Sequence, residues 1–180
     1  MRRTKITRRT GAALALALGL LVTVPATAGT ASADPGQSAA AHHRHQPRSI
    51  DLYPLQEKVL ERTYTGNPAT GFKVGDGGTW HSQLSDADGE VISDTRGTSL
   101  AVYQGADGLY TIMDNTDVLE DGTVHSYGLV NTNKLMAGEN IMLPVVGGTG
   151  RYEGYIGFRS FQKTTTEGMY NSRIQLWKSS

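Results

Sequence analysis

The chain has 180 residues, with 17 basic and 17 acidic side chains and no cysteine. That length suits one domain, and the lack of cysteine excludes disulfide scaffolds, thiol nucleophiles and thiolate-bound metal sites. Hydrophobic residues make up 38% of the chain and charged residues 19%, a composition that can form a buried core. The 22 glycines, about 12% of the chain against a typical ~7%, predict many tight turns.

Residues 1–33 have the three-part layout of a secretory signal peptide. A basic start is followed by an apolar run from Gly11 to Val24 and by two A-x-A sites, Ala26-Thr27-Ala28 and Ala31-Ser32-Ala33. The apolar run is shorter than the ~20 residues that span a bilayer, so we expect export with cleavage after Ala33. The general secretory route is favoured over the twin-arginine route, although Arg8-Arg9 would permit the latter.

Cleavage after Ala33 would change the charge of the protein. Five of the 17 basic residues and none of the acidic ones lie in the removed segment, which leaves 12 basic against 17 acidic side chains and a net charge of −5. An acidic domain without a basic patch disfavours nucleic-acid binding. We therefore predict a secreted, extracellular protein without a nucleic-acid partner and without membrane association after cleavage.

A flexible linker is predicted from Asp34 to Ser49, because this stretch is polar, holds two prolines and has no apolar periodicity. His42, His43 and His45 raise the alternative of a metal site. Ordering such a segment would cost much of the binding energy, so a solvated linker is favoured and no metal site is expected.

From Ile50 to the end, stretches that alternate in polarity are separated by clusters of glycine, aspartate and asparagine, which is typical of antiparallel strands. The only helical pattern is a turn around residues 53–58. The predicted strands are Glu57–Thr65, Gly78–Ser85, Val91–Gln104, Gly108–Val118, Thr123–Asn133, Ile141–Val146, Tyr155–Thr166 and Met169–Trp177. They allow a sandwich or a closed eight-stranded antiparallel barrel. We favour the barrel, because closure removes exposed edges and leaves room for one small ligand.

One segment, from Leu143 to Phe158, is more informative than the rest. Its sequence, LPVVGGTGRYEGYIGF, resembles the hallmark of the allene oxide cyclase and dirigent families. Glycines of this motif permit positive φ and close approach of strands; here they are Gly147, Gly148, Gly150, Gly154 and Gly157. Tyr152-Glu153-Gly154 is closer to the cyclase version, whereas the dirigent version has an arginine where this chain has Ile156, which argues against a phenoxy-radical role.

The resemblance extends more weakly over Glu57 to Trp177 and implies an eight-stranded barrel with a hydrophobic pocket. It implies no cofactor, and it raises the option of a homo-oligomer, since the plant families form trimers. The family's pocket glutamate falls on Glu61, and Thr63 stands where the family has an asparagine that helps to hold a water. A pocket phenylalanine falls on Trp80, and a further asparagine falls on Ser82.

These four residues also fit together without the resemblance. Alternation places Glu61 and Thr63 on one face of their strand, and Trp80 and Ser82 on one face of theirs. If both faces point inward, Glu61 would be a desolvated acid or base with a raised pKa, assisted by Ser82. Trp80 would hold an unsaturated chain in a folded shape. The alternatives are a surface carboxylate for Glu61 and a plain core aromatic for Trp80.

Other polar strand residues either line the lumen or face solvent, namely Arg96, Tyr103, Tyr127, Arg159 and Arg173. Tyr103 joins Thr63 and Trp80 as a candidate for substrate binding. The first hypothesis for function is a barrel that binds a small apolar or unsaturated molecule and acts as a cofactor-independent cyclase or isomerase. The alternatives are a non-catalytic binding protein, like dirigent or lipocalin proteins, and a structural secreted module whose lumen is filled by side chains.

Overall fold

The computed structural model describes residues 47–67 and 71–178. The predicted signal peptide with its cleavage sites, and the linker histidines His42, His43 and His45, lie outside the described residues. Within the described residues, no helix has the length and apolar character that would let it cross a membrane.

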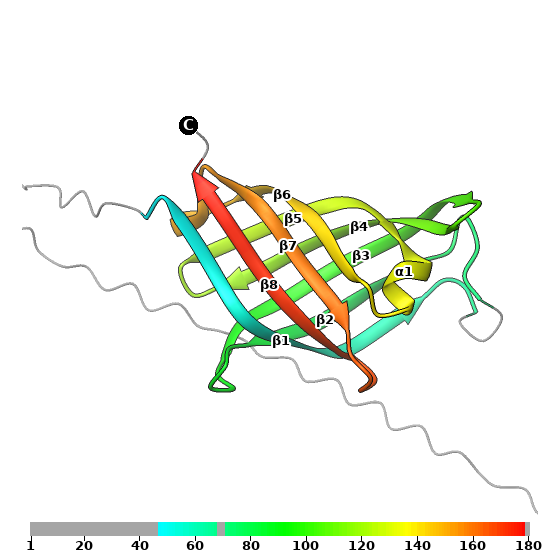
Figure 1. Ribbon diagram of the computed structural model, residues 1–180, viewed down its shortest axis with the longest axis horizontal. Coiled ribbons are helices and arrows are strands. Elements are labelled where there is room, and N and C mark those ends of the chain that lie inside the picture. The colour runs from blue at the N-terminus through cyan, green and yellow to red at the C-terminus, as the bar shows by residue number, and fades with distance from the viewer. Residues whose placement is uncertain (1–46, 68–70, 179–180) are drawn as a thin grey trace, which may run out of the picture. The chain divides into compact units, whose positions relative to one another are not determined.

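Eight antiparallel strands form a closed barrel, as the sequence predicted (Figure 1). The strands follow one another around the barrel in chain order, and β1 pairs with both β2 and β8. Their bounds are β1 (Ser49–Tyr64), β2 (Gly77–Ser85), β3 (Val91–Gly105), β4 (Gly108–Leu119), β5 (Gly122–Asn131), β6 (Asn140–Gly148), β7 (Tyr155–Lys163) and β8 (Met169–Lys178). The short helix α1 (Thr132–Met136) joins β5 to β6, and the 3-10 turn η2 (Gly150–Tyr152) precedes β7.

The first strand is longer than predicted. It begins at Ser49 rather than at Glu57, and residues 53–58 are extended rather than helical. Ile50 and Leu52 face Leu176 and Ile174 on β8, but the register shifts before Leu55, so that Tyr53 and Pro54 interrupt the alternation. Because of this irregularity, apolar residues do not recur at every second position in this part of the sequence.

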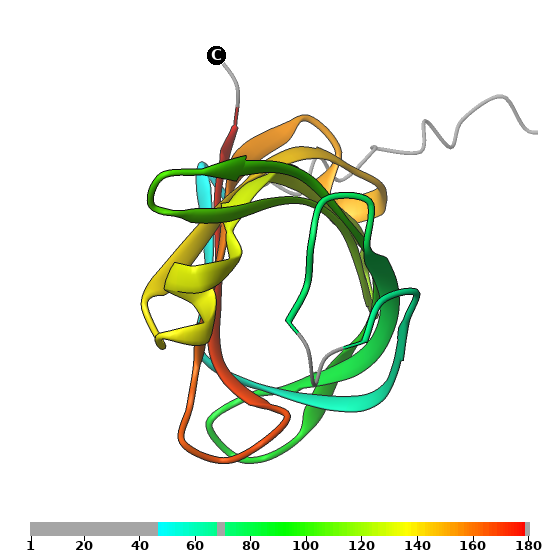
Figure 2. The ribbon, with the colours of Figure 1, turned by 90° about the vertical axis from the view of Figure 1, so that its right-hand side faces the viewer.

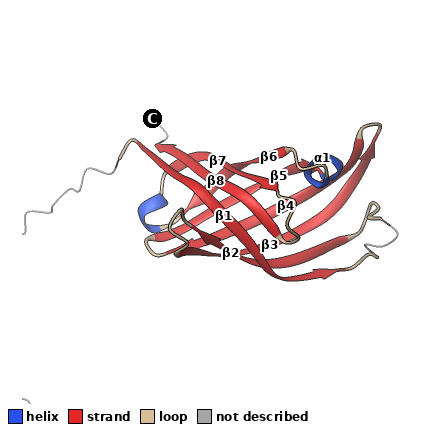
Figure 3. Ribbon diagram, turned by 60° about the horizontal axis from the view of Figure 1, so that its bottom comes forward, coloured by secondary structure: helices blue, strands red, loops and turns tan. Residues whose placement is uncertain are grey.

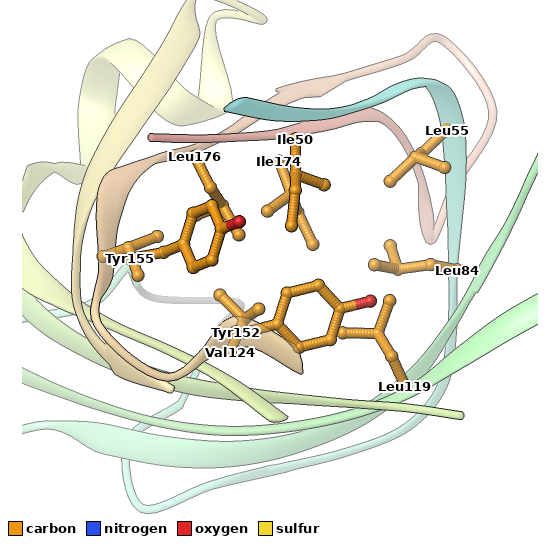
Figure 4. Close-up of a cluster of buried hydrophobic side chains, with 10 residues drawn as sticks. Ile50, Leu55, Leu84, Leu119, Val124, Tyr152, Tyr155, Ile174 and Leu176 are labelled. Atoms are coloured by element: carbon orange, nitrogen blue, oxygen red, sulfur yellow. The ribbon is translucent and has the colours of Figure 1, made fainter. Parts of the chain in front are cut away.

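One end of the barrel is filled by apolar side chains that point toward one another (Figure 4). We call this end the closed half; its buried residues are Ile50, Leu55, Leu84, Leu119, Val124, Val145, Tyr152, Tyr155, Ile174 and Leu176. Tyr152 comes from η2, and the turn around it is bracketed by Gly150 (φ 60°) and Gly154 (φ 75°). Positive φ favours glycine, so the GGTGRYEG segment is a turn whose glycines allow a tyrosine to enter the barrel end.

The other end carries α1, which lies at the end of the barrel opposite η2 (Figure 3). Asn131 begins this helix by accepting hydrogen bonds from the backbone N–H groups of Asn133 and Lys134. Leu135 of α1 packs with Ile141, Phe161 and Tyr170 in a second buried cluster. We call the part of the barrel next to this end the open half, and Figure 2 shows the barrel viewed from this end.

Candidate functional site

A cavity of about 130 Å³ occupies the open half of the barrel. A single water needs roughly 10–15 Å³, so this cavity has room for a small organic molecule. Its apolar and aromatic wall residues are Val59, Tyr64, Phe72, Trp80, Ala101, Met113, Leu135, Met136, Phe161 and Tyr170. Its polar lining includes Glu57, Arg62, Asp76, Asn115 and Arg159. Such a mixture of apolar walls and few polar groups is typical of small-molecule sites.

The cavity exists because β3 presents small side chains to the interior. Ser93, Thr95, Gly97 and Ala101 are buried at alternate positions along this strand, and Ser99 lies between the last two. At Gly97, an added Cβ would lie 2.1 Å from Cζ2 of Trp80. Glycine at this position therefore lets the indole ring lie against the β3 backbone.

Buried charges form the floor of the cavity, between the open and the closed halves. Nη2 of Arg159 donates to Oε2 of Glu57 at 2.9 Å, and Nε donates to Oδ2 of Asp117, also at 2.9 Å. All three side chains are buried, and the guanidinium is only 1% exposed. Asp117 also accepts a 2.6 Å hydrogen bond from Thr95. The three strands β1, β4 and β7 are thus tied together through the interior.

Hydrogen bonds hold Glu57 in its ionised form. Ser82 donates to its Oε1 at 2.6 Å, and Ser172 donates to its Oε2 at 3.1 Å. Burial alone would raise the pKa of Glu57, but the Arg159 guanidinium and these hydroxyls outweigh burial and hold that pKa below its ordinary value. Burial would lower the pKa of Arg159, but the carboxylates of Asp117 and Glu57 raise it. Glu57 and Arg159 are therefore both charged near neutral pH, and Asp117 is the second carboxylate paired with the guanidinium.

A buried amide lies beside this network. Asn115 on β4 is 2% exposed, and its Oδ1 has no hydrogen-bond partner among the described residues. An added Cβ on Gly97 would lie 2.7 Å from this oxygen. Most buried polar side chains have a partner, so an unpaired amide in a cavity wall needs an explanation.

Arg62 stands near the rim of the cavity, where β1 ends. Its Nη2 donates to the hydroxyl of Tyr170 at 2.6 Å, and its guanidinium carbon lies 5.6 Å from the centre of the same ring. Burial would lower the pKa of Arg62, but the two tyrosine hydroxyls of Tyr170 and Tyr64 raise it. A cation therefore lies near the entrance, separate from the charged floor. The described residues contain no group of three or more histidine, aspartate or glutamate side chains arranged to hold a metal.

A family model, the allene oxide cyclase barrel like domain, matches residues 57–176. The chain belongs to this family. No curated protein matches the sequence. Among solved structures, a nonspecific heme-binding cyclase that catalyses a 4 + 2 cycloaddition is 26% identical, with a TM-score of 0.67 over 75% of this chain and 66% of that one. The Diels-Alderase AbmU from Streptomyces koyangensis is also 26% identical, with a TM-score of 0.66 over 73% of this chain and 64% of that one.

This chain therefore spans just under two thirds of the length of those two structures. The pterocarpan synthase dirigent protein PsPTS1 is 13% identical, with a TM-score of 0.57 over 75% of this chain and 98% of that one. At that identity the likeness concerns the fold alone. The family model confirms the resemblance of the sequence to the allene oxide cyclase family, and the likeness to dirigent proteins extends to the barrel fold.

In this member of the allene oxide cyclase barrel-like family, Glu61 is not inside the barrel. A β-bulge shifts the register of β1 between Val59, which faces Ser82, and Glu61, which faces His81. Because Ser82 is buried inside the barrel, its neighbour His81 and the paired Glu61 face outward. The expectation that Glu61 points into the lumen is therefore wrong, and the bulge places Arg62 in the inward position instead.

The other three positions taken from the cyclase pattern lie in or near the cavity. Trp80 lines it. Ser82 is fully buried and donates to Glu57 beneath the floor. Thr63 is exposed at the rim, where its hydroxyl lies 2.8 Å from that of Thr79. Tyr103, in contrast, is 59% exposed and contacts Tyr110 outside the cavity, so it is not placed to bind a ligand there.

Of the remaining polar candidates, only Arg159 lies in the lumen. Arg96 is exposed beside Asp94, Tyr127 is exposed, and Arg173 pairs with Asp51 on the outside. Sequence reasoning missed Glu57 and Asn115. Alternation places Glu57 on the same face of its strand as Val59, but the match to the family's pocket glutamate directed attention to Glu61.

Proposed function

We propose that this barrel binds a small, largely apolar and unsaturated molecule in the open half and promotes its cyclisation or isomerisation there. The observation that carries the proposal is a cavity with aromatic walls whose inner end is closed by the buried ion pairs of Glu57, Arg159 and Asp117. A flexible chain confined between Trp80 and Phe161 loses most of its unproductive conformers. Holding reacting atoms together in this way can lower a barrier by several kcal/mol, up to about 7–11.

The proposed reaction assigns no proton transfer to Glu57. A carboxylate whose pKa lies below its ordinary value is a poor proton donor near neutral pH and a weak base. Its oxygens are already engaged by Arg159, Ser82 and Ser172. Catalysis by shape and fixed charge is therefore favoured over general acid–base chemistry.

Two comparisons support a cyclisation. The two solved structures at 26% identity are described as a cyclase that catalyses a cycloaddition and as a Diels-Alderase. A Diels–Alder reaction is a 4 + 2 cycloaddition, so both descriptions name one reaction class, which joins atoms of unsaturated groups and agrees with a cavity that has aromatic walls. The identity of the substrate is a separate question from the reaction class.

The test is mass spectrometry of small molecules that copurify with the protein, followed by incubation of the captured compound with fresh protein. Ala101→Leu is the matched variant, since Ala101 lines the cavity and is 3% exposed; the larger side chain fills the cavity. We expect a compound to copurify with the wild-type protein and not with Ala101→Leu. Incubation of this compound with fresh wild-type protein should give a cyclised or isomerised product. Capture that Ala101→Leu leaves unchanged would contradict the proposal.

Non-catalytic binding is the second candidate function. The observation that favours it is the engagement of Glu57 and Asp117 by Arg159, which leaves the cavity floor without a free acid or base. Both functions predict capture of a compound, and turnover separates them. If the captured compound stays unchanged after prolonged incubation with fresh protein, the protein is a carrier.

We further propose that residues 1–33 direct export and are removed after Ala33. The basic start, the apolar run and the A-x-A sites support this proposal. Amino-terminal sequencing of protein from the culture medium should begin at Asp34. Protein retained in cells with Met1 intact would contradict it.

A further inference from the structure

We propose that Arg159 and Asn115 form a two-donor site for the carbonyl oxygen of a neutral ligand at the cavity floor. The inference rests on the proposed function, because it names the group by which that ligand is held. It assigns the ligand to the class of apolar, unsaturated carbonyl compounds.

Arg159 has a donor to spare. Its Nε and Nη2 are used by Asp117 and Glu57, whereas its Nη1 bonds to none of the residues that the structure describes. The side chain is 1% exposed and lines the cavity. A guanidinium held on two sides by carboxylates cannot rotate to satisfy its remaining N–H groups elsewhere, so the free donors are fixed in place.

Asn115 offers a second donor. Its Oδ1 is buried against Trp80 and Gly97 without a partner, and its Nδ2 makes no hydrogen bond to a described residue. Leaving a buried amide unpaired costs free energy. A ligand oxygen that accepts from Nδ2 would pair the donor side of this amide, and the two lone pairs of a carbonyl oxygen suit two donors.

The floor charge selects a neutral carbonyl over a carboxylate. Glu57 and Asp117 carry two negative charges against one positive charge on Arg159. An anionic head group at this place would be repelled by the surplus negative charge in a region of low dielectric. The other cation in the cavity lining is Arg62, which donates to Tyr170 near the rim. A ligand whose carboxylate bound to Arg62 would point its apolar body toward the floor, which is the reverse of the proposed orientation.

Two hydrogen bonds to a conjugated carbonyl also withdraw electron density from the adjacent double bond. Fixed donors aimed at an oxygen that gains charge in the transition state are an efficient form of electrostatic catalysis. In this arrangement Trp80 and Phe161 would contact the apolar body, while Arg159 and Asn115 activate its polar end. No proton or electron is transferred to the protein.

The test uses three probes that share a naphthalene body and differ in the group at its 2-position: 2-acetonaphthone, 2-ethylnaphthalene and 2-naphthoate. Dissociation constants are measured by calorimetry on the full protein and on Asn115→Leu, which removes the amide and keeps the branching at Cγ. Ser126→Ala is the matched control, because Ser126 also has a buried hydroxyl that bonds to none of the described residues, and it does not line the cavity. The stretching frequency of a 13C-labelled carbonyl in bound 2-acetonaphthone reports its hydrogen bonds directly.

We expect 2-acetonaphthone to bind about tenfold more tightly than 2-ethylnaphthalene, which is the effect of a net ~1.4 kcal/mol. Asn115→Leu should remove most of that preference and raise the carbonyl frequency, whereas Ser126→Ala should change neither. Equal binding of the ketone and the hydrocarbon, both abolished by Ala101→Leu, would overturn the carbonyl site and leave the proposed function standing. Tighter binding of 2-naphthoate that depends on Asn115 would overturn the neutral class. Failure of all three probes to bind would contradict the inference and the proposed function together.

Discussion

The two halves of this barrel are built from the same strands, yet one is filled and the other is hollow. In the closed half, Leu84, Ile174 and Leu176 meet Tyr152, which enters from the η2 turn (Figure 4). In the open half, β3 presents Gly97 and Ala101 to the lumen. Strand pairing runs through both halves except between β5 and β6, which pair only from Val124 to Ser126. The difference teaches that inward side-chain size, together with one inserted turn, decides where a barrel can accept a ligand.

The charged floor marks the boundary between the halves. Burying Glu57, Asp117 and Arg159 is unfavourable unless each charge is compensated, and replacement of such a cluster by apolar residues is often neutral or stabilising. Filling this layer with leucine would extend the closed half. Retention of charge at this level therefore agrees better with a role at the cavity than with stability alone.

The largest expected effect comes from breaking the boundary itself. Arg159→Met leaves two buried carboxylates without a counter-ion, so we expect a loss of about 3–5 kcal/mol in the free energy of unfolding. Urea denaturation measures this loss. Arg151→Met is the control, because Arg151 pairs with Asp121 where both side chains are about half exposed, and exposed pairs contribute about 0–1 kcal/mol. A similar small effect for both variants would show that the floor pairs do not hold the strands together.

The next effect compares the halves through one truncation in each. Leu176→Ala removes a fully buried side chain of the closed half and should cost about 2–5 kcal/mol. Met113 is only partly buried and lines the cavity, so Met113→Ala enlarges an existing space and should cost less. Thermal unfolding of both variants shows which truncation causes the larger loss of stability. Equal losses would mean that the open half is as tightly packed as the closed one.

A smaller effect is expected from acid. The pKa of Glu57 is lower in the folded protein than its ordinary value of 4.5, so its ionised form stabilises the fold above that pH. This contribution is lost as the pH falls below 4.5 and through the folded pKa. Glu57→Gln should therefore flatten the decrease of the unfolding free energy as the pH falls below 4.5. The exposed Glu153→Gln should keep the wild-type slope, and a wild-type slope in Glu57→Gln as well would exclude Glu57 from the acid response.

The barrel could be predicted from the sequence, because period-two alternation and glycine-rich turns repeat along the chain and the segment from Leu143 to Phe158 resembles a known motif. The residues of β1 that point into the barrel could not be predicted in the same way. Alternation is correct from Glu57 to Val59, but Leu60 is the extra residue of a bulge, after which Arg62 takes the inward place. One inserted residue exchanges the two faces of a strand, and no local signal in the sequence marks it.

The inward position of Trp80 follows from alternation, because β2 runs without a bulge from Gly77 to Leu84. Arg159 and Asn115 are harder to predict, because a charged or amide residue in a strand is more often at the surface. Their burial depends on partners from distant strands, Asp117 on β4 and Glu57 on β1 in the case of Arg159. Such pairing is a property of the closed barrel and not of any single segment.

The smallest expected effect separates the two glutamates of β1. Glu61 faces outward beside His81, so Glu61→Gln should leave both ligand capture and the free energy of unfolding unchanged within about 0.5 kcal/mol. Glu57→Gln removes the acceptor of Arg159 and Ser82 and should weaken capture, because the floor loses its fixed geometry. Both are measured by copurification of the bound compound and by urea denaturation. If Glu61→Gln lost the bound compound and Glu57→Gln kept it, the ligand would contact the outer face of the barrel and not the cavity.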